Sequence, residues 1–203
     1  MNIVEDLQSN IPFIGYYQIK DLTICDAVID YWKNANHTQG EIYSSEGIPV
    51  VNKKIKDSID STINIVSNCD NQMHQYFIAL EACLNLYLKK YKFLNSIISP
   101  WKITEDVNIQ YYPPGGGFKE WHCERVSPRL PYVNRVLVFM TYLNTINEKN
   151  KAGGTEWFYQ KLKLPAVKGH TVIWPVDWMF THKGIIAKKS EKYIITGWYN
   201  FIP

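Results

Sequence analysis

Two histidines, one glutamate and one lysine have types and spacing that could do chemistry together. His122 and Glu124 are separated by one residue, His182 lies 58 residues beyond Glu124, and Lys192 lies 10 residues beyond His182. Two imidazoles and one carboxylate are the ligand set of the facial triad that holds non-haem Fe(II), and this triad leaves coordination positions open for a co-substrate and O2. A lysine beside such a site could hold an anionic co-substrate.

The spacing of His122 and Glu124 predicts that both lie on one β-strand. Residues two apart on a strand point to the same face, so this pair can bind one ion while Cys123 points away. The second histidine has to come from another strand, because three ligands on one strand could not cover one octahedral face. The other histidines are interpreted as structural; they are His37, His74 and His170.

The composition is that of an ordinary globular domain. The 203 residues are 46% hydrophobic and 20% charged, which suffices for one domain with one core. We expect a single catalytic domain over 1–203, with 1–100 as a mainly helical support region and 101–203 as the jelly-roll core that carries the site.

Charge and cysteine usage suggest where the protein acts. The net charge is +3 and the lysines are spread over several segments, which favours solvated loops, and no nucleic-acid partner is expected. No stretch approaches the roughly 20 apolar residues that span a bilayer, so no membrane partner is expected. Residues 1–10 contain no apolar run of a secretory signal, and the four cysteines form no C-x-x-C pair. These features favour a reducing, cytoplasmic location.

Periodicity predicts which elements position the candidate ligands. Apolar residues three and four apart predict helices over 21–32 and 70–91. Strands are predicted at 48–51, 107–112, 135–144, 155–159, 171–174 and 192–201. Short strands joined by Gly and Pro turns predict an α+β fold, a double-stranded β-helix (jelly roll) with the N-terminal helices packed on one sheet. The Pro- and Gly-rich segment 113–117 is either a lid over the pocket or a rigid turn.

Nearly half of the chain, from about 107 to 201, resembles the prolyl-hydroxylase group of 2-oxoglutarate- and Fe(II)-dependent oxygenases. The resemblance is carried by the stretches 112–124, 135–144, 153–156 and 182–184 and by Lys192 and Trp198. It implies that His122, Glu124 and His182 bind the iron and form the catalytic set. It also implies that Lys192, ten residues after the distal histidine, binds the distal carboxylate of 2-oxoglutarate.

Further co-substrate residues follow from the resemblance and from strand geometry. Tyr112 and Tyr142 resemble tyrosines that contact 2-oxoglutarate in this group, and a core aromatic side chain is the alternative interpretation of each. Thr196 and Trp198 share a strand face with Lys192 and are expected to line the same pocket.

Three features bear on the substrate. Arg135 matches a pocket-facing arginine of the group, and Trp121 flanks the first ligand, so both are predicted to contact the substrate. Glu124 stands where the group usually has aspartate, and its extra methylene requires the backbone or the iron to adjust by about an ångström.

The resemblance implies hydroxylation of a C–H bond, with a prolyl residue of a peptide or protein as the first choice of substrate. The reaction would consume O2 and 2-oxoglutarate at an Fe(II) site, release succinate and CO2, and use ascorbate as reductant. One alternative is a hydroxylase of a free amino acid or another small metabolite, since related families share the scaffold. A non-catalytic jelly-roll binding module is a second alternative, and an intact triad with Lys192 in register argues against it.

Overall fold

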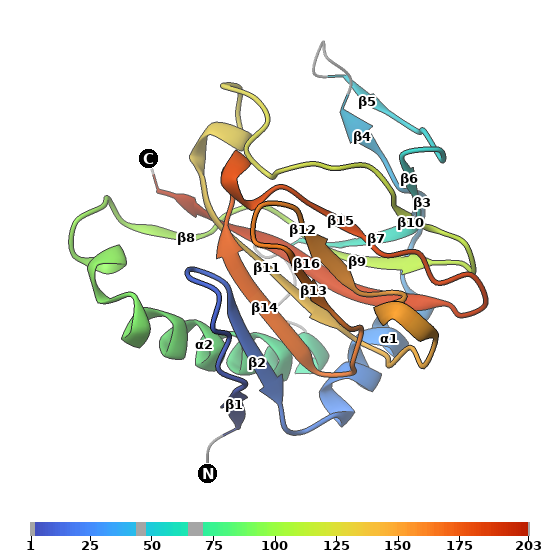
Figure 1. The fold of residues 1–203 in the computed structure, drawn as a ribbon, viewed down its shortest axis with the longest axis horizontal. Helices are drawn as coiled ribbons and strands as arrows, with labels where there is room; N and C mark the ends of the chain where they lie inside the picture. The colour runs from blue at the N-terminus through green and yellow to red at the C-terminus, as the bar shows by residue number, and fades with distance from the viewer. Residues whose placement is uncertain (1–2, 44–47, 65–70, 203) are drawn as a thin grey trace.

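The computed structural model describes residues 3–43, 48–64 and 71–202 (Figure 1). Its two α-helices are α1 (Thr23–Asn34) and α2 (Asn71–Lys90), and neither is long and apolar enough to cross a membrane. The strands of the described ranges are β1 (Val4–Asp6), β2 (Gly15–Ile19), β3 (Thr38–Gln39), β4 (Ile42–Tyr43), β5 (Pro49–Val50), β6 (Lys56–Asp57), β7 (Ile59–Ile63), β8 (Trp101–Ile103), β9 (Val107–Tyr112), β10 (Gly117–Phe118), β11 (Arg135–Tyr142), β12 (Thr155–Trp157), β13 (Leu162–Leu164), β14 (His170–Pro175), β15 (His182–Gly184) and β16 (Lys192–Phe201). Short 3-10 helices are η1 (Lys92–Asn95), η2 (Tyr132–Asn134), η3 (Lys149–Lys151) and η4 (Trp178–Phe180).

The strands form two layers. The large sheet has nine strands in the order β1-β2-β14-β11-β16-β9-β7-β3, and β8 pairs with β16. The second layer contains the three-stranded sheet β13-β12-β15 and the pair β10-β6. Buried side chains of β12 and β13 pack against those of β11, β14 and β16, so a hydrophobic core fills the space between the layers. The predicted jelly roll is confirmed.

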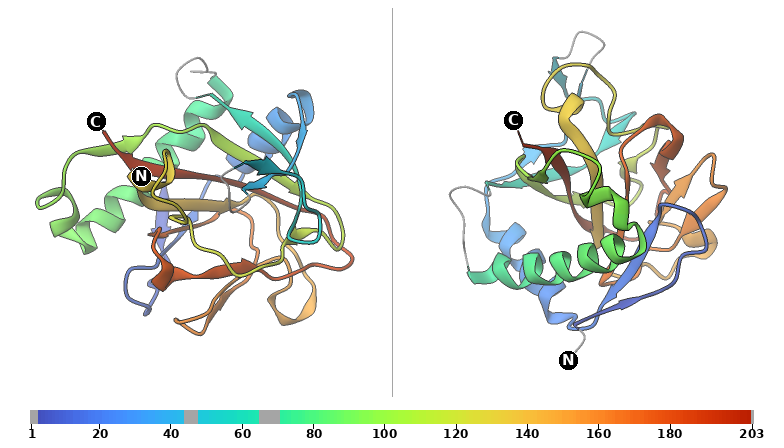
Figure 2. Two further views of the ribbon diagram at one scale, coloured as in Figure 1. Left: turned by 90° about the horizontal axis from the view of Figure 1, so that it is seen from above. Right: turned by 90° about the vertical axis from the view of Figure 1, so that its left-hand side faces the viewer.

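Alternation along β11 separates the two cores of the molecule. Leu137 and Phe139 pack with the helices, whereas Val138 and Met140 pack between the two sheet layers. This is the period of two that a strand buried on both faces must show. Figure 2 shows α1 and α2 on the same side of the large sheet, opposite the layer that contains the smaller sheets. The prediction that helices pack on one sheet is confirmed.

The same alternation on β16 delivers side chains to the site. Ile195 belongs to the core under the helices, while Ile194 belongs to the core between the layers. Three further side chains point to the same face of β16 as Ile194 and line the cavity between the layers; they are Lys192, Thr196 and Trp198. The sheet therefore positions one cation, one hydroxyl and one indole along one wall of that cavity.

The prediction of a mainly helical region over 1–100 is wrong for the described residues. Besides α1 and α2, this part contains seven strands, and β1, β2, β3 and β7 belong to the large sheet. The helical periodicity of α1 and α2 is long enough to predict both helices from sequence. Strands β2 and β7 have only five residues each, which is too short for a clear pattern. Strand formation by such short segments depends on the neighbours they pair with, which local sequence does not specify.

The prediction that His122 and Glu124 lie on a strand is also wrong. Strand β10 ends at Phe118, and the ligand segment continues as irregular backbone in which His122 makes an isolated β-bridge to His182. Only this one bridge joins the segment to β15, so its side chains are aimed by individual backbone hydrogen bonds.

Candidate active site

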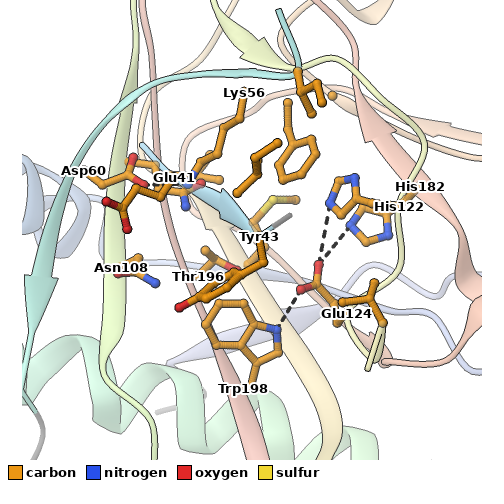
Figure 3. A pocket seen from close by; sticks show the side chains of 18 of the residues that line it. Glu41, Tyr43, Lys56, Asp60, Asn108, His122, Glu124, His182, Thr196 and Trp198 are labelled. Atoms are coloured by element: carbon orange, nitrogen blue, oxygen red, sulfur yellow. Dashed lines mark hydrogen bonds and ion pairs between the residues drawn. The ribbon is translucent and has the colours of Figure 1, made fainter. Parts of the chain in front are cut away.

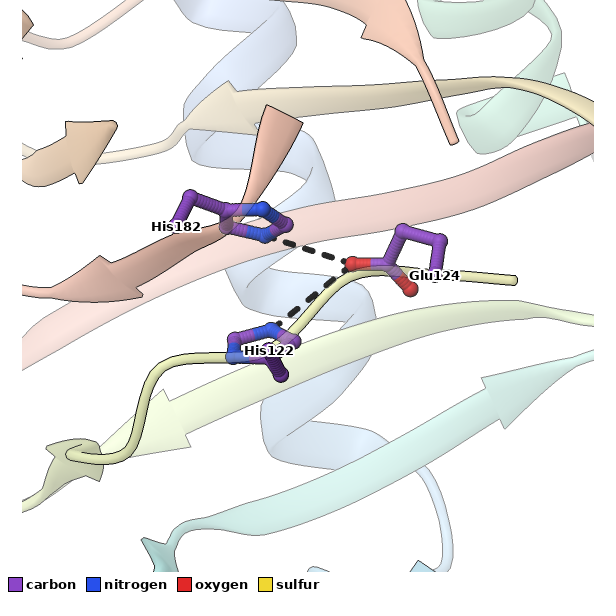
Figure 4. Close-up of side chains that lie close together, drawn as sticks. All are labelled: His122, Glu124 and His182. Carbon is purple, nitrogen blue, oxygen red and sulfur yellow. Dashed lines mark ion pairs between the residues drawn. The ribbon is translucent and has the colours of Figure 1, made fainter. Parts of the chain in front are cut away.

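His122, Glu124 and His182 converge at one point (Figure 4). Nε2 of His122 lies 3.7 Å from Oε1 of Glu124, and Nε2 of His182 lies 3.3 Å from the same oxygen. The three candidate ligand atoms all lie within 4.8 Å of one another. Adjacent ligands of an octahedral ion, each about 2.1 Å from the metal, are about 3 Å apart. The arrangement therefore fits one face of an octahedral metal ion.

Backbone hydrogen bonds hold the three residues in place. The N–H of His122 donates to the carbonyl of His182 at 3.0 Å, and the N–H of His182 donates to the carbonyl of His122 at 2.9 Å. The N–H of Glu124 donates to the carbonyl of Val176 at 3.0 Å. Segments about 60 residues apart are thus joined beside the ligands, and this non-local pairing creates the site.

The imidazoles have their metal-binding nitrogens free. Nδ1 of His122 lies 3.0 Å from the carbonyl oxygen of Glu120, and Nδ1 of His182 lies 2.9 Å from that of Phe180. A carbonyl can only accept, so each Nδ1 carries the proton and each Nε2 keeps its lone pair. Burial, and then the nearby His182, lower the pKa of His122 to about 4, so this ring is neutral at pH 7. The ring of Phe118 stacks on it with centroids 3.7 Å apart.

Glu124 is held ionised by a second set of contacts. Burial alone would raise the pKa of Glu124, but its close contact with His182 and its electrostatic interactions with His122 and Arg135 outweigh burial and lower that pKa to about 2. The indole N–H of Trp198 donates to Oε2 of Glu124 at 2.9 Å. Nη1 of Arg135 donates to the backbone carbonyl of Glu124 at 3.1 Å. Arg135 therefore holds Glu124 at its backbone carbonyl, and Trp198 holds it at Oε2. Oε1 is left facing the two histidines.

Arg135 is buried and already engaged. Its guanidinium makes two hydrogen bonds to the carboxylate of Glu105, at 2.9 and 2.6 Å, and lies 3.6 Å from the ring centroid of Trp198. Although it lines the cavity, these contacts make it a support for Glu124 and Trp198. No local sequence pattern indicates Glu105, because this partner of Arg135 lies on the irregular segment between β8 and β9.

Lys192 is a buried cation that no carboxylate of the described residues neutralises. Only 6% of the residue is exposed, and its Nζ lies 4.4 Å from the ring centroid of Tyr112, its partner across β9 and β16. Burial lowers the pKa of Lys192 to about 8. A charged group without a counter-ion is costly inside a protein, so this position fits an anion that arrives from solution.

A buried ion pair lies in the wall of the same cavity as Lys192. Nζ of Lys56 lies 2.6 Å from Oδ2 of Asp60, and both side chains are at least nine-tenths buried. Asp60 pairs across the sheet with Gln110, whose side-chain oxygen accepts a hydrogen bond from the hydroxyl of Tyr112 at 2.6 Å. The other carboxylate oxygen of Asp60 is buried without a hydrogen-bond partner. Figure 3 shows this pair and Glu41 across the pocket from the histidines.

Most of the predicted site residues meet in one cavity of about 700 Å³. This volume is within the range of small-molecule sites and has room for a co-substrate together with part of a substrate. The predicted residues that line it are Tyr112, Trp121, His122, Glu124, Arg135, His182, Lys192, Thr196 and Trp198. Residues that local sequence did not single out line it as well, among them Glu41, Lys56, Asp60, Glu105 and Phe118.

Three predicted residues take positions that modify their expected roles. Tyr142 is fully buried and stands behind the wall, where its hydroxyl donates to Thr155 at 2.7 Å; Thr155 lines the cavity. The hydroxyl of Thr196 donates to the carbonyl of Phe139 at 2.8 Å, so it is already satisfied. Trp121 is 37% exposed and forms part of the rim.

Comparisons with known proteins agree with this geometry. The family model of the 2OG-Fe(II) oxygenase superfamily matches residues 107–200, slightly less than half of the chain. A search of curated protein sequences finds no match.

Solved structures of prolyl hydroxylases share the fold. The viral collagen prolyl hydroxylase vCPH of Paramecium Bursaria Chlorella virus-1, in complex with 2OG, is 17% identical, with 94% of this chain and 97% of that chain covered and a TM-score of 0.64. A prolyl hydroxylase of Trichoplax adhaerens, in complex with a hypoxia inducible factor peptide fragment, is 17% identical over 88% of this chain and 77% of that chain, with a TM-score of 0.64. A prolyl-4-hydroxylase of Pseudomonas putida is 18% identical over 87% and 99%, with a TM-score of 0.55.

The match of the family model covers the three candidate ligands and Lys192, and the neighbours share the jelly roll almost end to end. Residues 107–200 thus match the model of the 2OG-Fe(II) oxygenase superfamily, and the chain has the fold of the solved prolyl hydroxylases.

Proposed function

We propose that this oxygenase hydroxylates a prolyl residue in a peptide or protein, with consumption of 2-oxoglutarate and O2 and release of succinate and CO2. The observation that carries the reaction type is the pairing of a three-ligand metal face with the unneutralised Lys192 in one cavity. Support for a prolyl substrate comes from the neighbours, which are prolyl hydroxylases, one of them in complex with a peptide fragment.

The residues have separate tasks in this proposal. Nε2 of His122, Nε2 of His182 and Oε1 of Glu124 would hold Fe(II), and Lys192 would bind the far carboxylate of 2-oxoglutarate. Bound Fe(II) and 2-oxoglutarate supply the oxidising chemistry that places one oxygen atom of O2 on a C–H bond of the substrate. Trp198 restricts Oε2 of Glu124 through its hydrogen bond, so that Oε1 remains directed at the metal position.

The wall around Lys192 excludes water from the ion pair it would form. The ring of Tyr112 covers one side of the ammonium, and the hydroxyl of Tyr112 is directed to Gln110. An ion pair in such a desolvated position is stronger than one in water, because the effective dielectric constant is lower. Tyr142 would act through Thr155, and Thr196 would shape the wall beside the co-substrate.

The remaining expectations are part of the same proposal. Residues 1–203 would act as one catalytic domain, with ascorbate as the reductant that keeps the iron ferrous. A cytoplasmic location fits the free thiols of Cys25 and Cys83, which are buried and form no disulfide.

Mass spectrometry of Pro-containing peptides tests the proposed substrate. Peptides incubated with the enzyme, Fe(II), 2-oxoglutarate and ascorbate should gain one oxygen atom on proline, with an equal amount of succinate released. The variants His122→Ala, Glu124→Ala and His182→Ala should each abolish turnover while the circular dichroism spectrum stays that of the wild type. Hydroxylation of free amino acids without hydroxylation of any peptide would instead establish a small-molecule hydroxylase.

A further inference from the structure

The charges that line the active-site cavity do not balance. Six carboxylates of the described residues line it, and they belong to Glu41, Asp60, Glu105, Asp106, Glu120 and Glu124. The Lys and Arg side chains that line it are three, namely Lys56, Arg135 and Lys192. With the two histidine ligands neutral, the lining carries an excess of three negative charges. Bound Fe(II) would add two positive charges and 2-oxoglutarate two negative ones, so the same excess remains in the loaded site.

Ion pairing places this excess at the rim of the cavity. Asp60 is paired with Lys56 at 2.6 Å. Glu105 is paired with Arg135, also at 2.6 Å, and Glu124 is a candidate metal ligand. The three carboxylates that remain have no ion-pair partner among the described residues and are exposed; they are Glu41, Asp106 and Glu120. They lie on three segments far apart in the sequence, and a cleft lined by charges of one sign attracts ligands of the opposite sign.

A buried acceptor in the cavity wall lacks a donor. The side chain of Asp60 lines the cavity and is only 10% exposed. Lys56 binds one of its carboxylate oxygens, and Oδ1 is buried without a hydrogen-bond partner. A buried carboxylate oxygen without a donor is costly, and an N–H group of a bound molecule would remove that cost. This oxygen is a second feature, independent of the exposed carboxylates, that fits a donor from a ligand.

The sheet face around Asp60 is polar as well. Thr62 is two residues further along β7, so it points to the same side, and it also lines the cavity. Asn108 and Gln110 of β9 lie opposite these two residues in register and line the cavity too. A polar chain can therefore lie along β7 and β9 with hydrogen-bonding groups beside it.

Glu41 and Tyr43 add groups that recognise a cation. They are two residues apart at β4, both line the cavity, and Figure 3 shows them in the part of the pocket that contains Asp60. Tyr43 is 53% exposed and packs edge to face on Tyr132, with ring centroids 5.4 Å apart. A carboxylate and an open aromatic face together bind an ammonium or guanidinium group, through an ion pair and a cation–π contact. The acidic rim, Oδ1 of Asp60 and this ring thus fit one chemical group, a cation that donates hydrogen bonds.

We propose that the outer part of the cavity binds a lysine or arginine side chain of the substrate. Glu41 and Asp106 attract the cation, and Oδ1 of Asp60 accepts one of its N–H groups. Because this group and the metal position share one cavity of about 700 Å³, the basic residue lies close in sequence to the hydroxylated residue. The inference rests on the proposed function, since it takes the substrate to be a peptide, and it names a basic flank as the determinant of specificity.

Calorimetric titration with three matched peptides tests this site without turnover. Each peptide contains one proline, flanked on both sides by lysine, by glutamine or by glutamate, and the protein holds Fe(II) and 2-oxoglutarate in the absence of O2. The lysine peptide should bind about tenfold more tightly than the glutamine peptide, and the glutamate peptide should bind most weakly. Because the rim carboxylates are exposed, higher salt should reduce this preference.

Substitutions at the rim locate the preference. Glu41→Gln and Asp106→Asn change exposed side chains, so both should keep the wild-type melting temperature. Each should weaken binding of the lysine peptide more than that of the glutamine peptide, and the two together should remove most of the preference. Glu5→Gln is the matched control, because Glu5 is an exposed carboxylate on β1, at the opposite edge of the large sheet from β3. It should leave the affinities of all three peptides unchanged.

The double variant Lys56→Met, Asp60→Leu tests the buried acceptor. It removes Oδ1 of Asp60 and leaves no unpaired charge in the wall. Binding of the lysine peptide should weaken about tenfold, the loss expected for a hydrogen bond to a charged group. Equal affinity for the three peptides, or failure of all three to bind, would overturn the inference. A lysine preference that survives both this variant and the combined rim variant would overturn it as well.

Turnover separates this inference from the proposed function. Proline hydroxylation with equal kcat/KM for the lysine and glutamine peptides would refute the basic flank and leave the proposed function standing. Charge-dependent binding of the lysine peptide, without hydroxylation of proline in any peptide, would refute the proposed function and leave the cation site standing.

Discussion

Replacement of Lys192 by methionine should stabilise the ligand-free protein and abolish its affinity for 2-oxoglutarate. The ammonium is buried against Tyr112, and no carboxylate of the described residues pairs with it. Methionine fills a similar volume without a charge, so the substitution removes a desolvation cost and leaves the packing of β16 intact. Lys192 thus lowers the stability of the ligand-free protein and, in this account, provides the charge that binds 2-oxoglutarate.

The magnitude follows from the lowered pKa. Burial lowers the pKa of Lys192 from 10.5 to about 8. Each pKa unit corresponds to ~1.4 kcal/mol, so the charged form destabilises the folded, ligand-free protein by about 3 kcal/mol at pH 7. Between pH 8 and pH 10.5 the unfolded chain binds more protons at this residue than the folded chain does. Wild-type stability should therefore gain from Lys192 as the pH rises through that window, and the variant should lack this gain.

Urea unfolding of metal-free protein at pH 7 and near pH 10 measures both effects. Lys192→Met should be more stable than the wild type by about 3 kcal/mol at pH 7, and the difference should shrink near pH 10. 2-Oxoglutarate with Fe(II), in the absence of O2, should raise the melting temperature of the wild type much more than that of the variant. Lys188→Met, at an exposed lysine, serves as the control and should change neither quantity. A variant less stable than the wild type, or with wild-type affinity for 2-oxoglutarate, would refute the reasoning.

Three further outcomes are expected. Trp198→Phe removes the donor to Oε2 of Glu124, so Fe(II) affinity in equilibrium dialysis should fall about 10- to 100-fold; an unchanged affinity would show that the hydrogen bond does not position the ligand. Lys56→Met or Asp60→Leu alone leaves a buried unpaired charge and should destabilise the protein by about 3–5 kcal/mol in urea unfolding, whereas the double variant should be close to the wild type. Additive losses in the double variant would contradict that account. The apparent KM for 2-oxoglutarate should rise above about pH 8 as Lys192 loses its proton in the free enzyme, and a flat profile up to pH 10 would count against its role.

Local sequence predicted the elements with strong periodicity or clear boundaries. The predicted strands at 107–112 and 192–201 are β9 and β16 with the same bounds; β9 is rich in β-branched and aromatic residues and stops at Pro113, and β16 begins after the polar residues Ser190 and Glu191. Strand parity then placed Lys192, Thr196 and Trp198 on one wall, and the structure brings all three to the cavity. The spacing of His122, Glu124 and His182 correctly indicated residues that the fold brings together, whereas the strand predicted for the first pair was wrong.

The rest of the site depends on pairings that no local pattern specifies. Lys56 reaches the cavity because β6 pairs with β10, and Asp60 does so because β7 pairs with β9 across about 50 residues of chain. Glu105 supports the site only through its hydrogen bonds with Arg135, which lies 30 residues away along the chain. Tyr142 points to the same face of β11 as the side chains that form the core between the layers. Strand alternation alone therefore does not show whether its side chain lines the cavity or lies behind the cavity wall. Register between distant strands is set by packing of the whole core, which explains why these contacts were missed.

Anaerobic titration with Fe(II) and 2-oxoglutarate tests the central claim that this cavity binds both together. The account predicts a weak visible charge-transfer band that needs both ligands and that His182→Ala abolishes. In Lys192→Met the band should appear only at much higher 2-oxoglutarate concentration, since iron binding is retained and the carboxylate anchor is lost. The absence of any band in the wild type, with iron and 2-oxoglutarate in excess, would contradict the account.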